Sequence, residues 1–63
     1  MLMAWRGTPD EAVVYAAAGI VAGQVRCPLE EAVEMLTDRA YEVTRTVPDA
    51  ARLVIAGVIR FDD

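Results

Sequence analysis

The chain has 63 residues and a net charge of −4, with no lysine, serine, histidine or asparagine and a single cysteine, Cys27. These absences exclude an internal disulfide and the usual zinc, Ser–His, Cys–His and lysine-based sites, so we expect no metal, no cofactor, no small-molecule substrate and no enzyme activity. A domain this small buries only about 60% of its unfolded surface, so with 56% hydrophobic residues the expected source of extra stability is a partner subunit.

Residues 1–7 show no helical periodicity, and we assign them to an N-terminal tail. Two alternatives are open for this tail: it is disordered, or Trp5 folds back onto the domain. Disorder is the expectation for a chain end. The domain itself is predicted to span residues 8–61.

The first predicted helix runs from Pro9 to about Val25, after a Thr8-x-x-Glu11 capping box. It has no polar face, and a helix that is apolar or small on every side is normally buried on every side. One side can pack inside a small domain, but the other needs a second chain, so we predict a homodimer through this helix. The predicted interface residues are Val14, Tyr15, Ala18, Val21, Ala22 and Val25.

The second predicted helix follows a break at Cys27, because a residue before proline avoids the helical region. Pro28 suits a first helical turn, and the acids after it suit the positive end of the helix dipole. The helix is predicted to end near Arg45. Its apolar residues recur at three- and four-residue spacings and form one stripe toward a core. This stripe comprises Leu29, Ala32, Val33, Leu36, Ala40 and Val43.

The outer face of this second helix is acidic and carries Glu30, Glu31, Glu34, Asp38 and Glu42. We interpret it as a solubilising surface, which is the usual role of such a charge run. Docking of a basic partner is the alternative.

The third predicted helix starts at Thr46, with Pro48 in its first turn and Asp49 at the box position. Gly57 is expected to weaken its last turn. Its predicted core face comprises Val47, Ala51, Val54, Ile55 and Val58. The sequence therefore predicts an all-α fold, a small three-helix bundle.

No membrane contact is expected, because the longest uncharged run, residues 12–25, is shorter than the ~20 residues of a membrane span. The residues before Gly7 are too few for a signal peptide. We therefore expect a cytoplasmic protein.

Four segments together resemble the ANTAR domain, a three-helix output module of bacterial antitermination regulators. They are residues 17–21, residues 27–32 followed by Leu36, the pair Arg39-Ala40, and residues 47–51. The resemblance covers roughly residues 14–55. It implies three helices that approach one another closely at small residues, here Ala17, Gly19, Ala40 and Ala51.

The resemblance also implies a function, because ANTAR domains bind a pair of short RNA hairpins, usually as a dimer, in transcription antitermination. The candidate RNA-binding residues are Arg26, Arg39, Arg45 and Arg52. Each arginine has a simpler interpretation as solvated or ion-paired surface, since Glu42 and Arg45, and Asp49 and Arg52, are three residues apart on predicted helices.

An alternative function follows from the departures from the ANTAR pattern. Ala18 stands where family members typically carry a lysine, and the positions of Tyr15 and Ala16 are usually polar in the family. The chain also has more acidic than basic residues, which is unusual for a nucleic-acid-binding protein. The alternative is a divergent ANTAR-like module for homodimerisation or protein interaction that has lost RNA binding.

Overall fold

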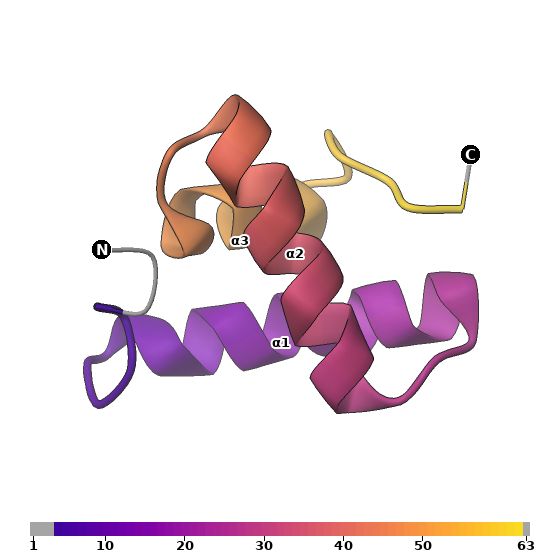
Figure 1. The fold of residues 1–63 in the computed structure, drawn as a ribbon, viewed down its shortest axis with the longest axis horizontal. Helices are drawn as coiled ribbons and strands as arrows, with labels where there is room; N and C mark the ends of the chain where they lie inside the picture. The colour runs from indigo at the N-terminus through magenta and orange to yellow at the C-terminus, as the bar shows by residue number, and fades with distance from the viewer. Residues whose placement is uncertain (1–3, 63) are drawn as a thin grey trace.

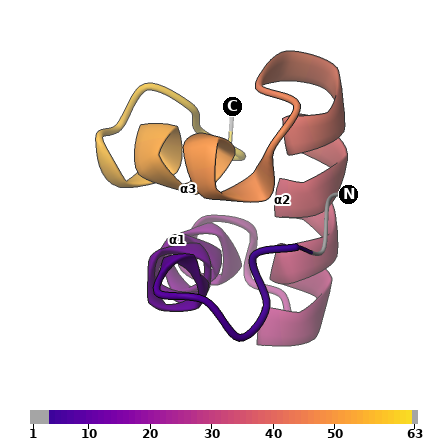
Figure 2. The same ribbon diagram turned by 90° about the vertical axis from the view of Figure 1, so that its left-hand side faces the viewer.

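The computed structural model describes residues 4–62, and these form three α-helices and no strand. The helices are α1 (Asp10–Val25), α2 (Leu29–Val43) and α3 (Val47–Ile55) (Figure 1). The axes of α1 and α2 are turned by 104° across the short connection between them. Figure 2 shows α1 and α3 one above the other, with α2 running along one side of both. The predicted all-α three-helix bundle is confirmed.

The start of α1 differs from the predicted capping box. Pro9 occupies the N-cap position with helical backbone angles and gives no side-chain cap. The Thr8 hydroxyl instead donates to the Trp5 carbonyl, and the Glu11 carboxylate accepts from the Gly7 N–H at 3.5 Å. The prediction that Thr8 caps α1 is therefore wrong, because Thr8 closes a turn with the segment that precedes the helix.

The start of α3 agrees with the prediction. Thr46 is the N-cap residue, and its hydroxyl accepts a hydrogen bond from the Asp49 N–H at 3.4 Å. Pro48 lies in the first turn, where its missing N–H costs no helical hydrogen bond.

The end of α3 comes earlier than predicted. Gly57 has a φ of 81°, and the N–H groups of Val58 and Ile59 both donate to the Leu53 carbonyl, at 2.9 and 3.3 Å. The chain therefore turns back, and Ile59 reaches the core. Ile55 and Val58 were predicted to be core residues, but they are 49% and 69% exposed. Ile55 is the last residue of α3 and lies off its buried face, which carries Val47, Ala50, Ala51 and Val54, and Val58 lies beyond the end of the helix.

The core is rich in alanine. Its fully buried alanines come from all three helices and are Ala17, Ala18, Ala32, Ala40, Ala50 and Ala51. Small side chains at these positions let the helices approach closely, as expected for Ala17, Ala40 and Ala51. Gly19 is exposed and takes no part in this contact. Leu29 and Val43, at the two ends of the predicted α2 stripe, are also exposed.

Residues outside the helices complete the core. Trp5 is only 3% exposed, so the second of the two alternatives for the N-terminal segment, in which Trp5 folds back, is the one observed. Its ring meets the ring of Tyr15 edge-on, with 5.8 Å between centroids. The Nε1 atom of Trp5 is buried and has no hydrogen-bond partner within residues 4–62. Trp5 therefore acts through packing.

We predict that Trp5→Ala destabilises the domain by about 3 kcal/mol, the usual cost of truncating a buried tryptophan. Urea denaturation followed by circular dichroism measures this change. Trp5→Phe should cost less than about 1 kcal/mol, because it keeps an aromatic ring and removes the unpaired buried N–H. Equal stability of Trp5→Ala and the wild type would show that the N-terminal segment does not belong to the folded domain.

Candidate functional site

Two arginines close the ends of helices in a backbone conformation that normally selects glycine. Arg26, at the end of α1, has a φ of 61°, and Arg45, after the end of α2, has a φ of 74°. The Arg26 N–H donates to the Ala22 carbonyl at 2.7 Å, and the Arg45 N–H donates to the Ala40 carbonyl at 2.6 Å. Within residues 4–62 these are the only non-glycine residues with positive φ. A side chain in this region costs roughly 1–2 kcal/mol.

The side chains of Arg26 and Arg45 are exposed and form no ion pair within the described part of the chain. The expected pair between Glu42 and Arg45 is therefore not formed. Arg26 precedes α2 and Arg45 follows it, so the whole of this 15-residue helix, about 22 Å long at 1.5 Å per residue, lies between them in the chain. They offer two positively charged points rather than one patch.

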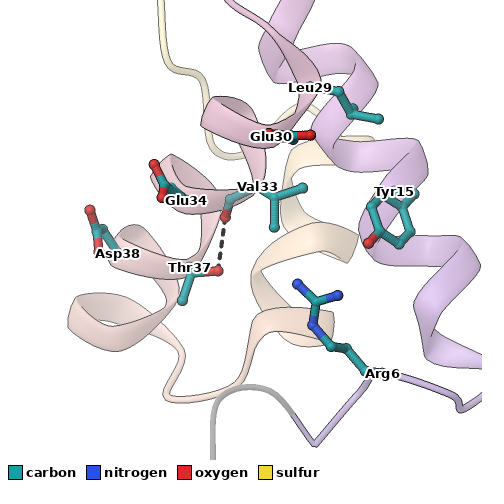
Figure 3. Close-up of a pocket in the computed structure, with 8 residues that line it drawn as sticks. All are labelled: Arg6, Tyr15, Leu29, Glu30, Val33, Glu34, Thr37 and Asp38. Atoms are coloured by element: carbon teal, nitrogen blue, oxygen red, sulfur yellow. Dashed lines mark hydrogen bonds between the residues drawn. The ribbon is translucent and has the colours of Figure 1, made fainter.

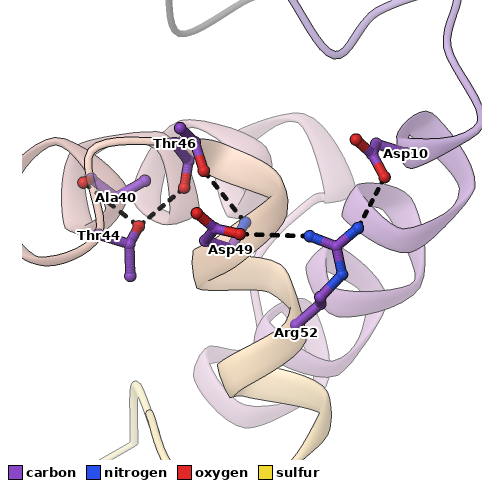
Figure 4. A network of polar contacts seen from close by, with 6 residues as sticks. All are labelled: Asp10, Ala40, Thr44, Thr46, Asp49 and Arg52. Carbon is purple, nitrogen blue, oxygen red and sulfur yellow. Dashed lines mark hydrogen bonds and ion pairs between the residues drawn. The ribbon is translucent and has the colours of Figure 1, made fainter.

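The other two candidate arginines already have partners. Figure 4 shows the Arg52 guanidinium between two carboxylates, with Nη2 2.8 Å from Asp10 and Nη1 3.3 Å from Asp49. The predicted Asp49–Arg52 pair is thus observed. The other contact of Arg52, to Asp10, links α3 to the start of α1. The guanidinium of Arg39 lies over the Phe61 ring, 4.7 Å from its centroid. A phosphate would have to compete with these contacts for Arg39 and Arg52. The structure therefore does not bring the four candidate arginines together as one phosphate site.

Phe61 belongs to a C-terminal segment that bridges two helices. Its N–H donates to the Gln24 side-chain oxygen of α1 at 3.1 Å, while its ring meets Arg39 of α2. Because its guanidinium covers the Phe61 ring, Arg39 packs this segment against α2. In the same segment Arg60 and Asp62 form an ion pair at 2.9 Å, and the hydrogen bond from Arg60 lowers the pKa of the Asp62 carboxyl.

Half of the predicted dimer interface is inside the single chain. Val14, Ala18 and Val21 are completely buried against α2 and α3, so they cannot contact a second subunit. The buried arc of α1 follows these residues because they recur at three- and four-residue spacing with Ala17. Of the remaining predicted positions, Tyr15 and Val25 are each 36% exposed and Ala22 is half-buried.

The face of α1 that is exposed carries no charge. Its exposed positions between residues 12 and 23 are Ala12, Tyr15, Ala16, Gly19, Ile20 and Gly23. Four of these six are alanine or glycine, and the two larger side chains, Tyr15 and Ile20, are 36% and 39% exposed. Space is open around both glycines, since no heavy atom lies within 4 Å of a Cβ placed on either.

A groove of about 630 Å³ lies between α1, α2 and the N-terminal segment (Figure 3). Tyr15, Leu29 and Val33 form its apolar part, and Val33 points toward Tyr15. The α2 side also carries carboxylates at four-residue intervals. The full lining is Arg6, Tyr15, Leu29, Glu30, Val33, Glu34, Thr37 and Asp38.

Arg6 forms the opposite side of this groove, on the N-terminal segment. Its guanidinium lies over the Trp5 ring, 4.9 Å from the centroid, and points toward Val33 in Figure 3. The sequence pattern did not connect Arg6 with α2, because that connection exists only when Trp5 folds back. The four-residue spacing of Glu30, Glu34 and Asp38 was visible in the sequence and was interpreted as a solubilising face.

Residues 4–62 contain no cluster of three or more potential metal ligands. In the same range no single helix is long and apolar enough to cross a membrane, although the sharply bent pair α1–α2 would pass on length and composition. Cys27 is half-buried and makes no disulfide.

Comparison of the chain with protein-family models, with curated proteins and with solved structures found no match. The functional argument therefore depends on the residues described above and on the ANTAR resemblance of the sequence.

We predict that Arg26→Gly and Arg45→Gly each raise the free energy of unfolding by roughly 0.5–1 kcal/mol. Glycine relieves the left-handed strain, and the gain is reduced by the larger entropy of glycine in the unfolded chain. Loss of a positive charge at a helix C-terminus also reduces it. Urea denaturation of both variants measures the change, with Arg60→Gln as the control for loss of one charge. Destabilisation of both would mean that these arginines contribute to the fold.

Proposed function

We propose that the chain is an RNA-binding regulator of the ANTAR type, acting in transcription antitermination. The observation that carries this proposal is the state of Arg26 and Arg45. Both guanidinium groups are exposed and form no ion pair with any residue from 4 to 62, and both residues occupy strained positions where glycine is expected to be more stable. Strained backbone retained at exposed charged residues is a reason to look for function there.

The three-helix fold supports the proposal in a second way. The segments that resemble the ANTAR pattern lie on α1, α2 and α3, and Ala17, Ala40 and Ala51 are buried at the helix contacts. Two positive points, one before α2 and one after it, are suited to a backbone that spans the domain, such as a hairpin pair. The acidic face of α2 repels phosphate, so RNA would approach the ends of this helix rather than its middle.

Binding with so few free positive charges is expected to be weak and strongly dependent on salt. Each neutralised phosphate contributes about −0.7 to −0.9 to the slope of log affinity against log salt. Two contacts therefore predict a total slope of roughly −1.4 to −1.8 per subunit.

A gel-shift experiment with a tandem-hairpin RNA at low salt tests the RNA proposal. The wild type should shift the RNA at micromolar concentration. The double variant with Arg26→Gly and Arg45→Gly should weaken RNA binding about tenfold or more. Its folded state is expected to be more stable than the wild type, so unfolding would not explain the loss of binding.

The matched control for this experiment is Arg60→Gln, which removes one positive charge away from the ends of α2. It should leave the shift nearly unchanged. The proposal fails if the wild type gives no shift, or if Arg60→Gln weakens binding as much as the double glycine variant.

Homodimerisation is the second candidate function, and the uncharged exposed face of α1 favours it. Ala16, Gly19 and Gly23 offer a surface on which a second helix can approach closely, and Ile20 supplies an apolar anchor. This face replaces the predicted interface through Val14, Ala18 and Val21. A dimer would bring a second pair of Arg26 and Arg45 into the same particle, which suits an RNA with two hairpins.

We predict that Ile20→Glu dissociates the dimer, because it places a charge in the centre of an apolar contact. Sedimentation velocity should give a dimer for the wild type and a monomer for the variant. Tyr41→Glu is the control, since Tyr41 is 70% exposed on α2 and lies outside this face. A monomeric wild type at micromolar concentration would exclude the dimer.

A further inference from the structure

The groove beside α2 has a chemistry that the proposed RNA-binding function does not use. Glu30, Glu34 and Asp38 lie along its α2 side, and none of them forms an ion pair within residues 4–62. Figure 3 shows Glu34 and Asp38 pointing outward from the rim, while Val33 points toward Tyr15. An apolar strip therefore runs beside a row of unpaired negative charges.

We propose that this groove binds a basic amphipathic helix from another protein. The three carboxylates are four residues apart, so successive carboxylates are separated by about 6 Å along α2. Arginine or lysine side chains at four-residue spacing on a partner helix have the same separation, and each can meet one carboxylate. Apolar side chains on the adjacent face of that helix would pack on Tyr15, Leu29 and Val33, the mode in which grooves usually bind helices.

Charge decides against a second copy of this chain as the occupant. Neutralising the row requires at least two basic residues on one helical face. Within this chain α1 contains no arginine, α2 contains Arg39 and α3 contains Arg52, and the sequence has no lysine. Arg39 lies over Phe61 and Arg52 is paired with two aspartates. No helix of a second copy therefore supplies a matching row.

Charge also decides against RNA at this site. Phosphate oxygens would be placed beside three carboxylates, which repel them, and the one positive side chain, Arg6, already lies over the Trp5 ring. Arg6 would instead favour one orientation of the partner helix in the groove. An acidic side chain on the partner, across its axis from the basic row, would meet Arg6 on the far side of the groove.

The test uses the whole chain and a fluorescently labelled synthetic helix of about 18 residues, with arginines at i, i+4 and i+8 beside a stripe of leucines. Fluorescence anisotropy at low salt should show saturable binding to the wild type. Glu34→Lys should weaken it about tenfold or more, because it sets like charges opposite each other. Glu42→Lys is the matched control, with the same charge change on α2 outside the groove, and should stay within about twofold of the wild type.

Leu29→Ala tests the apolar part of the groove without any change of charge. It should weaken binding about threefold or more, since Leu29 is 46% exposed and the loss of its side chain removes apolar contact. Circular dichroism on each variant establishes that the helices are retained.

Several results would overturn the proposal. They are no binding to the wild type, equal weakening by Glu34→Lys and Glu42→Lys, equal binding of a peptide whose leucines are replaced by glutamine, and complete displacement by spermine at the same concentration of positive charge. The last result would assign the groove to small polycations. The RNA gel shift distinguishes the two sites, because Glu34→Lys should not weaken it.

Discussion

Contact among three helices through alanine is the constraint on which the rest of the structure depends. Six alanines with no exposed surface, contributed by all three helices, line this contact. Small side chains allow the helix backbones to come close, but each buried methyl contributes only about 0.8 kcal/mol. The helices alone therefore bury little apolar surface, and a domain of 63 residues has little stability in reserve.

Larger side chains at the edges of this contact supply the buried apolar surface that the alanines lack. Leu36 is the largest fully buried side chain of the helices, and Trp5 and Ile59 come from the segments before α1 and after α3. Both segments turn back onto the bundle, through the Thr8 hydrogen bond to the Trp5 carbonyl and through the left-handed Gly57. The terminal segments are thus part of the core. The groove exists because the first of them also places Arg6 opposite α2.

The sequence predicted the fold well where the apolar residues form one stripe on one face of a helix. In α2 the apolar stripe identified Ala32, Val33, Leu36 and Ala40 as buried, and the prolines placed the breaks between helices. In α1 every side is apolar or small, so periodicity did not distinguish the inner face from the outer one, and core residues were assigned to a dimer interface. The end of α3 was missed because Gly57 was interpreted as a weak helical position rather than as the turn that ends the helix.

The candidate site was less predictable for a physical reason. Four arginines could be named from the sequence, but their roles depend on tertiary contacts. Asp10 lies 42 positions from Arg52, and Phe61 lies 22 positions from Arg39. The left-handed conformations of Arg26 and Arg45 could not be predicted either, because glycine is the usual sequence signal for such a helix end. Without a glycine, the sequence of a short connection does not show which residue adopts the left-handed conformation.

The distribution of charge around α2 links the two proposed partners. Within residues 4–62, the two arginines without ion pairs lie beyond its two ends, while three carboxylates without ion pairs lie along the groove between them, and Glu30 is four residues from Arg26 in the sequence. Charges within a Debye length, about 10 Å at 0.1 M salt, still act on one another. A basic helix in the groove would neutralise part of the negative field that opposes RNA at the end of α2. By thermodynamic linkage, RNA would then favour binding of the basic helix by the same factor. An acidic face is thus compatible with the proposed RNA binding, because its negative charge would weaken that binding until a partner covered it.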